Sequence, residues 1–180
     1  QDKEDNSELV RAKERLDQSI NSQPSLTGMT QESINNYNSK LREAQNAANV
    51  AETIINNGDA SIQDISENKV KVEEATNALN EAKRNLTADI TSLQTEVQKL
   101  SRRGDISNKK PSSVNTYNNQ IQALQSEINQ TENKANTIIR KPIRTLEEVN
   151  NALQEVNQIN QRLTDTINLL QPLANKESLK

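Results

Sequence analysis

The apolar residues of this 180-residue chain recur at steps of three and four, which is the period of an α-helix. A sustained alternation of apolar and polar residues, typical of strands, is not found in the sequence. Gly and Pro interrupt the helical pattern at four places, namely Pro24 to Gly28, Gly58, Gly104 to Pro111, and Pro142. The pattern therefore predicts an all-α chain with five helical segments.

Each segment carries one apolar stripe that can form a buried seam. The predicted seams are Leu9, Ala12, Leu16 and Ile20; Ile34, Tyr37, Leu41, Ala44, Ala48, Ala51 and Ile55; Val72, Ala75, Leu79, Ala82, Leu86, Ile90, Leu93, Val97 and Leu100; Val114, Tyr117, Ile121, Leu124, Ile128, Ala135 and Ile138; and Val149, Leu153, Val156, Ile159, Leu163, Ile167 and Leu170. Thr30 is a good N-cap for the second segment, Ser61 with Asp64 comes close to a capping box, and Thr145 with Glu148 forms one.

The third segment runs from Ser61 to about Leu100 without Gly or Pro. Its seam stays in phase through Thr87, Ala88 and Asp89, so nothing in the apolar pattern ends the helix there. We therefore predict one continuous helix over about 61–101. At ~1.5 Å per residue it would be about 60 Å long, which is too long for one small bundle.

An internal repeat explains this length. The string from Ser33 to Asn38 resembles the string from Ser113 to Asn118 at an offset of 80, and Leu79 and Leu86 match Leu163 and Leu170 at an offset of 84. The simplest interpretation is a first loop four residues shorter in the second copy and a second helix about one turn longer.

Each copy then has three helices, and short loops make successive helices antiparallel. The predicted fold is two tandem antiparallel three-helix bundles, residues 1–87 and 88–174, which share the helix over 61–101 and form an elongated rod. Residues 175–180 would lead into a next repeat. A coiled coil between two chains is the alternative, but the tight turns favour bundles that fold within one chain.

Composition narrows the function classes. The chain has no His and no Cys, so the commonest general base, the thiolate nucleophile and the usual zinc ligands are absent. We expect no enzymatic activity and no cofactor. With a net charge of −3 and two Tyr as the only aromatic residues, nucleic acid is not an expected partner. No apolar run approaches the ~20 residues of a membrane span.

Asp59 and Asp64 flank the Asn57–Gly58 turn, but Ala60 and Ile62 stand where a calcium loop needs oxygen ligands. A helix stop followed by an acidic helix start is the favoured interpretation.

Two basic clusters could contact an acidic partner or a cell-wall polyanion, although cations near helix C-termini are the more ordinary reading. They are Lys99, Arg102, Arg103, Lys109 and Lys110, and Arg140, Lys141 and Arg144. The up-down-up order puts their two loops at opposite ends of the bundle. Tyr37 and Tyr117 are expected in the core with their hydroxyls at its rim.

Four longer strings of the sequence resemble modules of a known protein family. Residues 27–38, which read TGMTQESINNYN, and residues 55–60, which read INNGDA, resemble the FIVAR module of the giant staphylococcal extracellular-matrix-binding proteins of the Embp/Ebh type. Residues 109–118, KKPSSVNTYN, and residues 138–145, IIRKPIRT, resemble the GA-like module that accompanies it. The resemblance covers nearly the whole chain.

The resemblance implies a repeat module of a bacterial surface adhesin, in which each unit binds host fibronectin weakly and repetition supplies avidity. Its other partners would be neighbouring repeats, and its place would be the extracellular cell surface. A passive stalk that binds nothing is the alternative. Gln1 in place of an initiator Met suggests a piece of a longer protein, so the anchor and targeting signals are expected elsewhere. The resemblance supplies no ligand-binding residues, and none are assigned.

Overall fold

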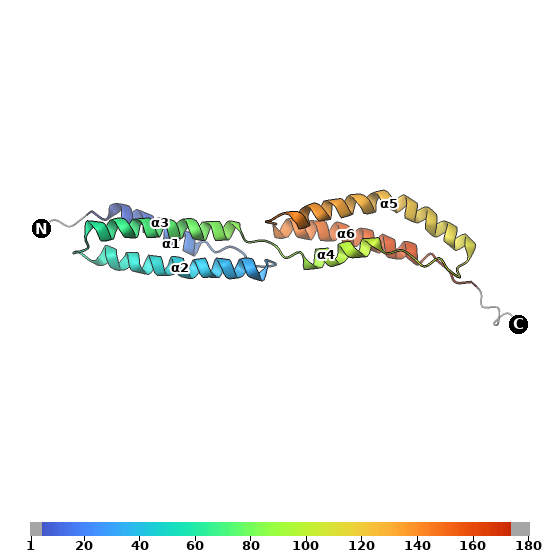
Figure 1. Ribbon diagram of the computed structural model, residues 1–180, viewed down its shortest axis with the longest axis horizontal. Coiled ribbons are helices and arrows are strands. Elements are labelled where there is room, and N and C mark those ends of the chain that lie inside the picture. Colours follow the sequence, from blue (N-terminus) through green and yellow to red (C-terminus); the bar gives the residue numbers. More distant parts are fainter. Residues whose placement is uncertain (1–4, 174–180) are drawn as a thin grey trace. The chain divides into compact units, whose positions relative to one another are not determined.

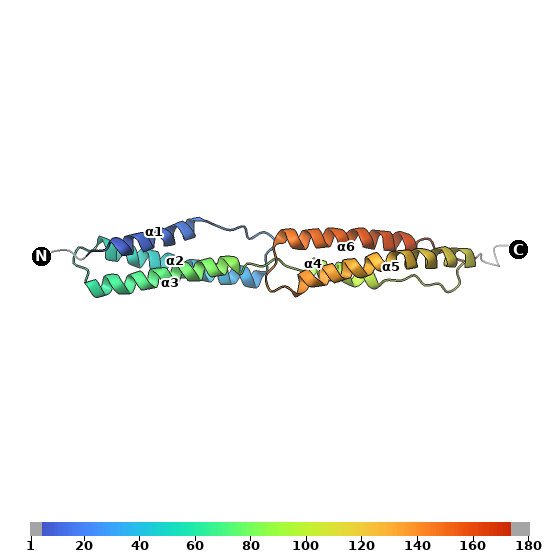
Figure 2. The same cartoon turned by 90° about the horizontal axis from the view of Figure 1, so that it is seen from above.

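The computed structural model describes residues 5–173, and all of its regular structure is helical (Figure 1). The chain divides into two compact units between Thr87 and Ala88, here called unit 1 and unit 2. Each unit contains three helical segments lying side by side (Figures 1 and 2). The all-α prediction is confirmed. The predicted lead into a next repeat, 175–180, lies outside the described residues, and the elongated rod stays a prediction.

Unit 1 consists of α1 (Ser7–Asn21), α2 (Gln31–Asn56) and α3 (Ile62–Arg84). The three helices run antiparallel in chain order, and α3 packs against both α1 and α2. Their seams meet in one core, as predicted from the spacing. Its buried residues are Leu9, Ala12, Leu16, Tyr37, Ala44, Ala48, Ala51, Val72, Leu79, Ala82 and Leu86.

Unit 2 consists of α4 (Thr91–Gln98), a short 3₁₀ turn η1 (Lys99–Ser101), α5 (Pro111–Arg140) and α6 (Leu146–Ile167). Here α6 takes the place of α3 and packs against both α4 and α5. Most of the buried apolar residues again fall on the predicted seams, whereas Ala88 and Ala152 are buried outside them and the predicted seam residue Leu153 is only half-buried. The buried apolar residues of unit 2 are Ala88, Leu93, Leu100, Tyr117, Leu124, Ile128, Ala135, Val149, Ala152, Val156, Ile159 and Leu163.

The predicted helix starts are confirmed. The Thr30 side chain accepts a hydrogen bond from the backbone N–H of Ser33 (3.2 Å), and the Ser61 side chain accepts one from the N–H of Asp64 (3.0 Å). Thr145 and Glu148 form a full capping box, in which each side chain bonds the backbone N–H of the other residue. These bonds satisfy N–H groups that the first helical turn leaves without partners.

The predicted continuous helix over 61–101 is wrong. Helix α3 ends at Arg84 and α4 begins at Thr91, so six residues between them are not helical. The seam stays in phase because Leu86 and Leu93 keep a spacing of seven across this break. A heptad count alone therefore does not detect it.

The break has a physical cause in bonds that a helix could not make. The Thr87 carbonyl accepts the Thr30 N–H (2.8 Å), and the Thr87 N–H is bonded to Ser33 Oγ (3.3 Å). The Asp89 carboxylate accepts both the N–H (3.1 Å) and the hydroxyl (2.8 Å) of Thr91, which starts α4. Asn, Thr and Asp are all weak helix formers, and Asn85, Thr87 and Asp89 fall together here.

The two units differ in the lengths of their helices and not in their first loops. That loop covers 22–30 in unit 1 and 102–110 in unit 2, and it turns through left-handed backbone at Gly28 and at the equivalent Asn108. The expected shorter loop is therefore wrong. The four-residue difference lies instead in the first helical segment of each unit. It has 15 residues in unit 1, where it is α1, and 8 plus 3 residues in unit 2, where it consists of α4 and η1. The longer second helix is confirmed, with 26 residues in α2 and 30 in α5.

Both units close with the same backbone clamp. In unit 2 the Lys110 N–H donates to the Gln171 carbonyl (2.8 Å), and the Gln171 N–H donates to Ser113 Oγ (3.1 Å). These bonds repeat those made by Thr30, Thr87 and Ser33 in unit 1. The segment after the last helix is thus tied to the start of the second helix in each unit.

Candidate functional site

In the first basic cluster, the two arginines donate hydrogen bonds to other groups of unit 2. Arg102 donates from Nε to the Lys99 carbonyl and from Nη2 to the Asn160 carbonyl (both 3.0 Å). Arg103 donates to the Leu100 carbonyl (3.0 Å) and to Gln125 Oε1 (2.9 Å). These guanidinium groups cap the end of η1 and join it to α5 and α6, which is the structural role expected of cations at a helix C-terminus.

The rest of that cluster is more open. Lys99 forms an ion pair with Glu96 (2.8 Å). Lys109 is half-buried and Lys110 is exposed, and both contribute backbone groups to the pairing with residues 171–173. The two lysine side chains alone offer little for recognition of a polyanion.

The second basic cluster also serves the fold. Arg144 donates to the carbonyls of Lys141 (2.6 Å), Ile139 (3.3 Å) and Ala88 (3.2 Å), which holds the α5–α6 loop to the start of unit 2. Lys141 forms an ion pair with Glu148. The two clusters lie at opposite ends of α5, as predicted, so they do not merge into one basic surface.

The two tyrosines are core residues, as predicted. Both are buried, and the Tyr117 hydroxyl accepts a hydrogen bond from the Gly104 N–H (2.7 Å). Burial raises the pKa of the Tyr37 phenol. Neither tyrosine lines either of the two grooves described below.

The acidic residues next to Gly58 form turn and cap bonds instead of a cation site. The Asp59 N–H donates to Asn57 Oδ1 (3.0 Å), and the Asp64 N–H is the partner of Ser61. Among residues 5–173, no three acidic, His or Cys side chains are grouped so that they could hold a metal ion. In the same range, none of the helices has the length and hydrophobicity for a bilayer crossing.

One polar cluster in unit 2 was missed by the sequence reasoning. Asn160 is buried on α6, and its Nδ2 donates to the Glu96 carbonyl (2.8 Å) and to Glu96 Oε2 (3.1 Å). Its Oδ1 is buried and makes no hydrogen bond within the described residues. The hydrogen bond from Lys99 is the main reason that the pKa of Glu96 lies below its ordinary value. The only sequence signal was an Asn directly after the seam position Ile159.

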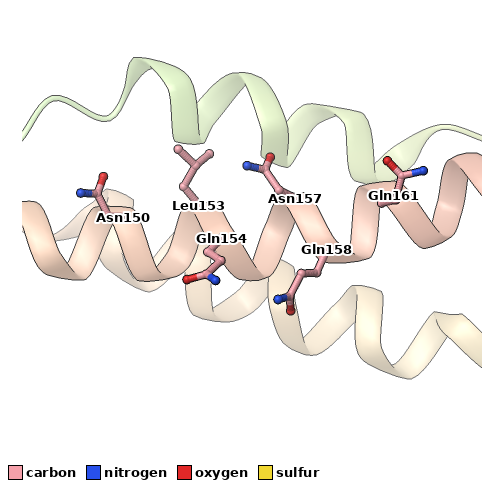
Figure 3. Close-up of a pocket in the computed structure, with 6 residues that line it drawn as sticks. All are labelled: Asn150, Leu153, Gln154, Asn157, Gln158 and Gln161. Carbon is pink, nitrogen blue, oxygen red and sulfur yellow. The ribbon is translucent and has the colours of Figure 1, made fainter.

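A shallow groove of about 530 Å³ runs along α6, and we call it the amide face (Figure 3). Its lining is uncharged and consists of Asn150, Leu153, Gln154, Asn157, Gln158 and Gln161. Gln161 donates to Asp165 (3.1 Å), whereas the other four amides make no side-chain hydrogen bond within the described part of the chain. Their donors and acceptors are therefore available to a partner.

A second groove, of about 390 Å³, lies between α5 and α6. Its lining combines the apolar residues Ile138 and Ala152 with the charged residues Lys134, Glu148 and Glu155. Both grooves are open to solvent and contain no enclosed pocket with converging polar groups, which is the usual form of a small-molecule site.

Comparison with known proteins places the chain in a family. The FIVAR domain model matches residues 12–80 and again residues 82–164. The second match falls on the unit for which the sequence resemblance gave a GA-like module, and that GA-like assignment stays a prediction.

Similar proteins come from Staphylococcus aureus. Over all 180 residues the chain is 52% identical to the extracellular matrix-binding protein EbhB of strain Newman and to the extracellular matrix-binding protein ebh of strain NCTC 8325 / PS 47. It spans only 3% and 2% of their lengths. The resemblance to staphylococcal matrix-binding proteins is confirmed.

A solved structure from work on Staphylococcus epidermidis adherence to fibronectin, mediated by the extracellular matrix binding protein Embp, covers 91% of this chain and 98% of its own. It is 27% identical, with a TM-score of 0.35. The two successive matches to one family model account for most of the sequence, and the chain belongs to the FIVAR domain family.

Proposed function

We propose that this chain is a non-enzymatic repeat module of an extracellular, cell-surface adhesin and that it binds host matrix protein weakly in each copy. The observation that carries the proposal is the pair of FIVAR matches together with 52% identity to proteins named for extracellular matrix binding, of which the chain spans a few per cent. Proteins of that length have room for many such modules. Linked modules turn later contacts into intramolecular ones, so weak units bind well together.

Fibronectin is the proposed matrix partner, on the strength of the family resemblance of the quoted strings. The physical properties of the surface support weak binding in each unit. The grooves are shallow, and most of the arginines of the two basic clusters are engaged by backbone carbonyls. A neutral contact surface also predicts binding that depends little on salt, because screening acts on charges.

The amide face is the first surface that we would test for this contact. It is absent from unit 1, where the positions equivalent to Asn157 and Gln158 are Glu73 and Glu74, and the position of Gln154 is Val70. If the matrix protein binds there, unit 2 carries the contact.

The test measures binding of the chain to immobilised fibronectin and compares it with three or four copies in tandem. We expect a weak signal from one copy and a gain of at least about 10²-fold in apparent affinity from the tandem form. No binding by the tandem form would favour the passive stalk.

The contact surface is tested in the tandem form with Asn157→Glu and Gln158→Glu in every copy. A matched control carries Asn115→Glu and Asn119→Glu, which are exposed amides on α5 of the same unit. Loss of binding in the first form alone would assign the amide face. Equal loss in both would point to a general charge effect, and retention in both would place the contact elsewhere.

A further inference from the structure

The large apolar side chains that remain exposed gather at the ends of the units. Seven such residues occur in the described range. Five of them lie in loops or at helix ends, and only Val50 and Val70 lie within helices away from the ends. The five are Ile62, Ile106, Ile143, Leu169 and Leu173. The sides of the bundles are thus largely polar, whereas their ends offer apolar surface to a partner.

One end of unit 2 is the most apolar of these. It consists of Ile106 in the α4–α5 loop, Leu169 just after α6, and Leu173, and we call it the exit end. The exposed fractions of the three side chains are 50%, 39% and 52%. The Leu173 N–H donates to the Asn108 carbonyl (3.1 Å), and Lys109 pairs with Pro172, so Leu173 is held beside the loop that carries Ile106.

The equivalent positions one repeat earlier are less apolar. Asn85 stands at the position of Leu169, and Asp89 at that of Leu173. Leu26, at the position of Ile106, is half-buried against the core of unit 1. The exposed apolar surface is thus a property of unit 2 and not of the repeat in general.

The repeated backbone clamp indicates what covers this surface. Gln171 is held by Lys110 and Ser113 just as Thr87 is held by Thr30 and Ser33. The residue after Thr87 is Ala88, the first residue of a new three-helix unit. Pro172 therefore occupies the position at which another unit of this fold begins, and the related proteins are long enough to hold many units.

We propose that the exit end of unit 2 docks the α2–α3 loop end of unit 1 in a second copy of this chain. That end offers Ile62, the first residue of α3, whose side chain is 67% exposed and is the most exposed of the seven. The contact joins two different surfaces. It is therefore heterologous and leaves one free end on each side, so it extends into a head-to-tail array.

The contact is weak for separate copies. A few half-exposed side chains bury far less than the roughly 1,200 Å² of a stable interface. Copies linked in one polypeptide would dock readily because the effective concentration of the neighbouring end is high.

The test is sedimentation equilibrium of the full chain at concentrations up to about 1 mM, where millimolar association is measurable. We expect the average mass to rise with concentration. Leu173→Glu and Ile62→Glu should each lower the association constant about tenfold or more, since a charge replaces the burial of one apolar side chain. Val70→Glu is the matched control, because Val70 is also 52% exposed but lies within a helix away from the unit ends. Circular dichroism checks that each variant is folded, and Ile106→Glu replaces any variant that is not.

Mixing the two variants gives the sharper test. Leu173→Glu keeps a working unit 1 end and Ile62→Glu keeps a working exit end, so the mixture should regain dimers but no larger species. The proposal is overturned if the unchanged chain stays monomeric, if Val70→Glu weakens association as much as Leu173→Glu, or if the mixture associates no better than either variant alone.

Discussion

The two units form similar three-helix cores from helices of different lengths. Both place Tyr near the start of the second helix and a fully buried Leu on the third, at Leu79 and Leu163. Compared with unit 1, the first helical segment of unit 2 is four residues shorter and its second helix is four residues longer, while the loop between them has the same length. Four residues are about one helical turn, so each seam returns to the same face after the change. Length can therefore move between helices of a bundle without altering the core pattern.

The units also differ in which interior positions carry polar side chains. Glu96 and Asn160 of unit 2 stand where unit 1 has Ala12 and Thr76. Unit 2 also places Arg102 against the Asn160 carbonyl, beside the shortened α4 and η1. We infer that polar bonds replace part of the apolar contact that the missing helical turn would supply. The predictions below test where the units are equivalent and where they are not.

The largest expected effect concerns the equivalent core leucines. Leu79→Ala and Leu163→Ala should each lower the free energy of unfolding by about 2–5 kcal/mol, because both side chains are fully buried and leave a cavity. Hydrogen exchange measured separately in each unit should show the loss only in the unit that carries the change. Val70→Ala, at an exposed position, is the control. A loss under about 1 kcal/mol at both leucines would refute the seam assignment.

A smaller effect is expected at Gly104, which has Pro24 as its counterpart in unit 1. A Cβ added there would lie 2.4 Å from Leu170 Cδ1 and 3.3 Å from Tyr117 Cε1. Gly104→Ala should destabilise unit 2 by about 1–3 kcal/mol through overpacking. In a Leu170→Ala background the added cost should fall toward zero, because the clashing methyl group is gone. An undiminished cost in that background would place the strain elsewhere.

Loss of the tyrosine hydroxyl should lower the stability of unit 2 more than that of unit 1, because the Tyr117 hydroxyl accepts a hydrogen bond. Tyr117→Phe removes the acceptor of the Gly104 N–H and should cost about 1 kcal/mol. Tyr37→Phe should stay within about 0.5 kcal/mol, because its hydroxyl makes no hydrogen bond within the described residues. Denaturant unfolding of the two variants gives the comparison. Equal costs would mean that the hydroxyl bond to Gly104 contributes little to stability.

Much of this fold could be predicted from the spacing of the apolar residues and from the N-cap residues. Thr30, Ser61 and Thr145 start helices as predicted, because a short hydroxyl side chain satisfies free N–H groups. The break at 85–90 was not predictable from the apolar pattern, since Leu86 and Leu93 keep the heptad across it. Its cause is tertiary, because the bonds of Thr87 to Thr30 and Ser33 join positions more than fifty residues apart.

The surfaces were less predictable than the core. The basic clusters were visible in the sequence, but their bonds to backbone carbonyls depend on where loops bring Arg102 and Arg144. The amide face on α6 is spread over three turns among many other Asn and Gln residues, so only the folded helix collects it on one side. Side-chain chemistry alone does not distinguish such a face from ordinary solvated amides.

The smallest expected effect is a difference in acid sensitivity between the units. Hydrogen bonds lower the pKa values of four carboxyl groups in unit 2, namely Asp89, Glu96, Asp105 and Glu148, and of two in unit 1, Asp5 and Glu52. A carboxyl group whose pKa is lower in the folded state stabilises the fold above its unfolded-state pKa. That contribution is lost as the pH falls through the lowered folded-state pKa. Unit 2 should therefore lose more stability than unit 1 below about pH 4.5, the ordinary pKa of Glu.

Glu96 makes this difference specific, because unit 1 has Ala12 in its place. Hydrogen exchange of each unit at pH 7 and near pH 3, corrected for the intrinsic rate, reports the loss. Glu96→Gln should weaken unit 2 most at pH 7, where the hydrogen bond from Lys99 loses its negatively charged acceptor, and less as the pH falls, because protonation of the original carboxyl group removes the same contribution. Glu147→Gln alters an exposed carboxyl group of the same unit and should leave the difference between the two pH values unchanged. If both units lost the same stability on acidification, or if Glu96→Gln left the difference intact, the carboxylate of Glu96 would not contribute to the stability of unit 2.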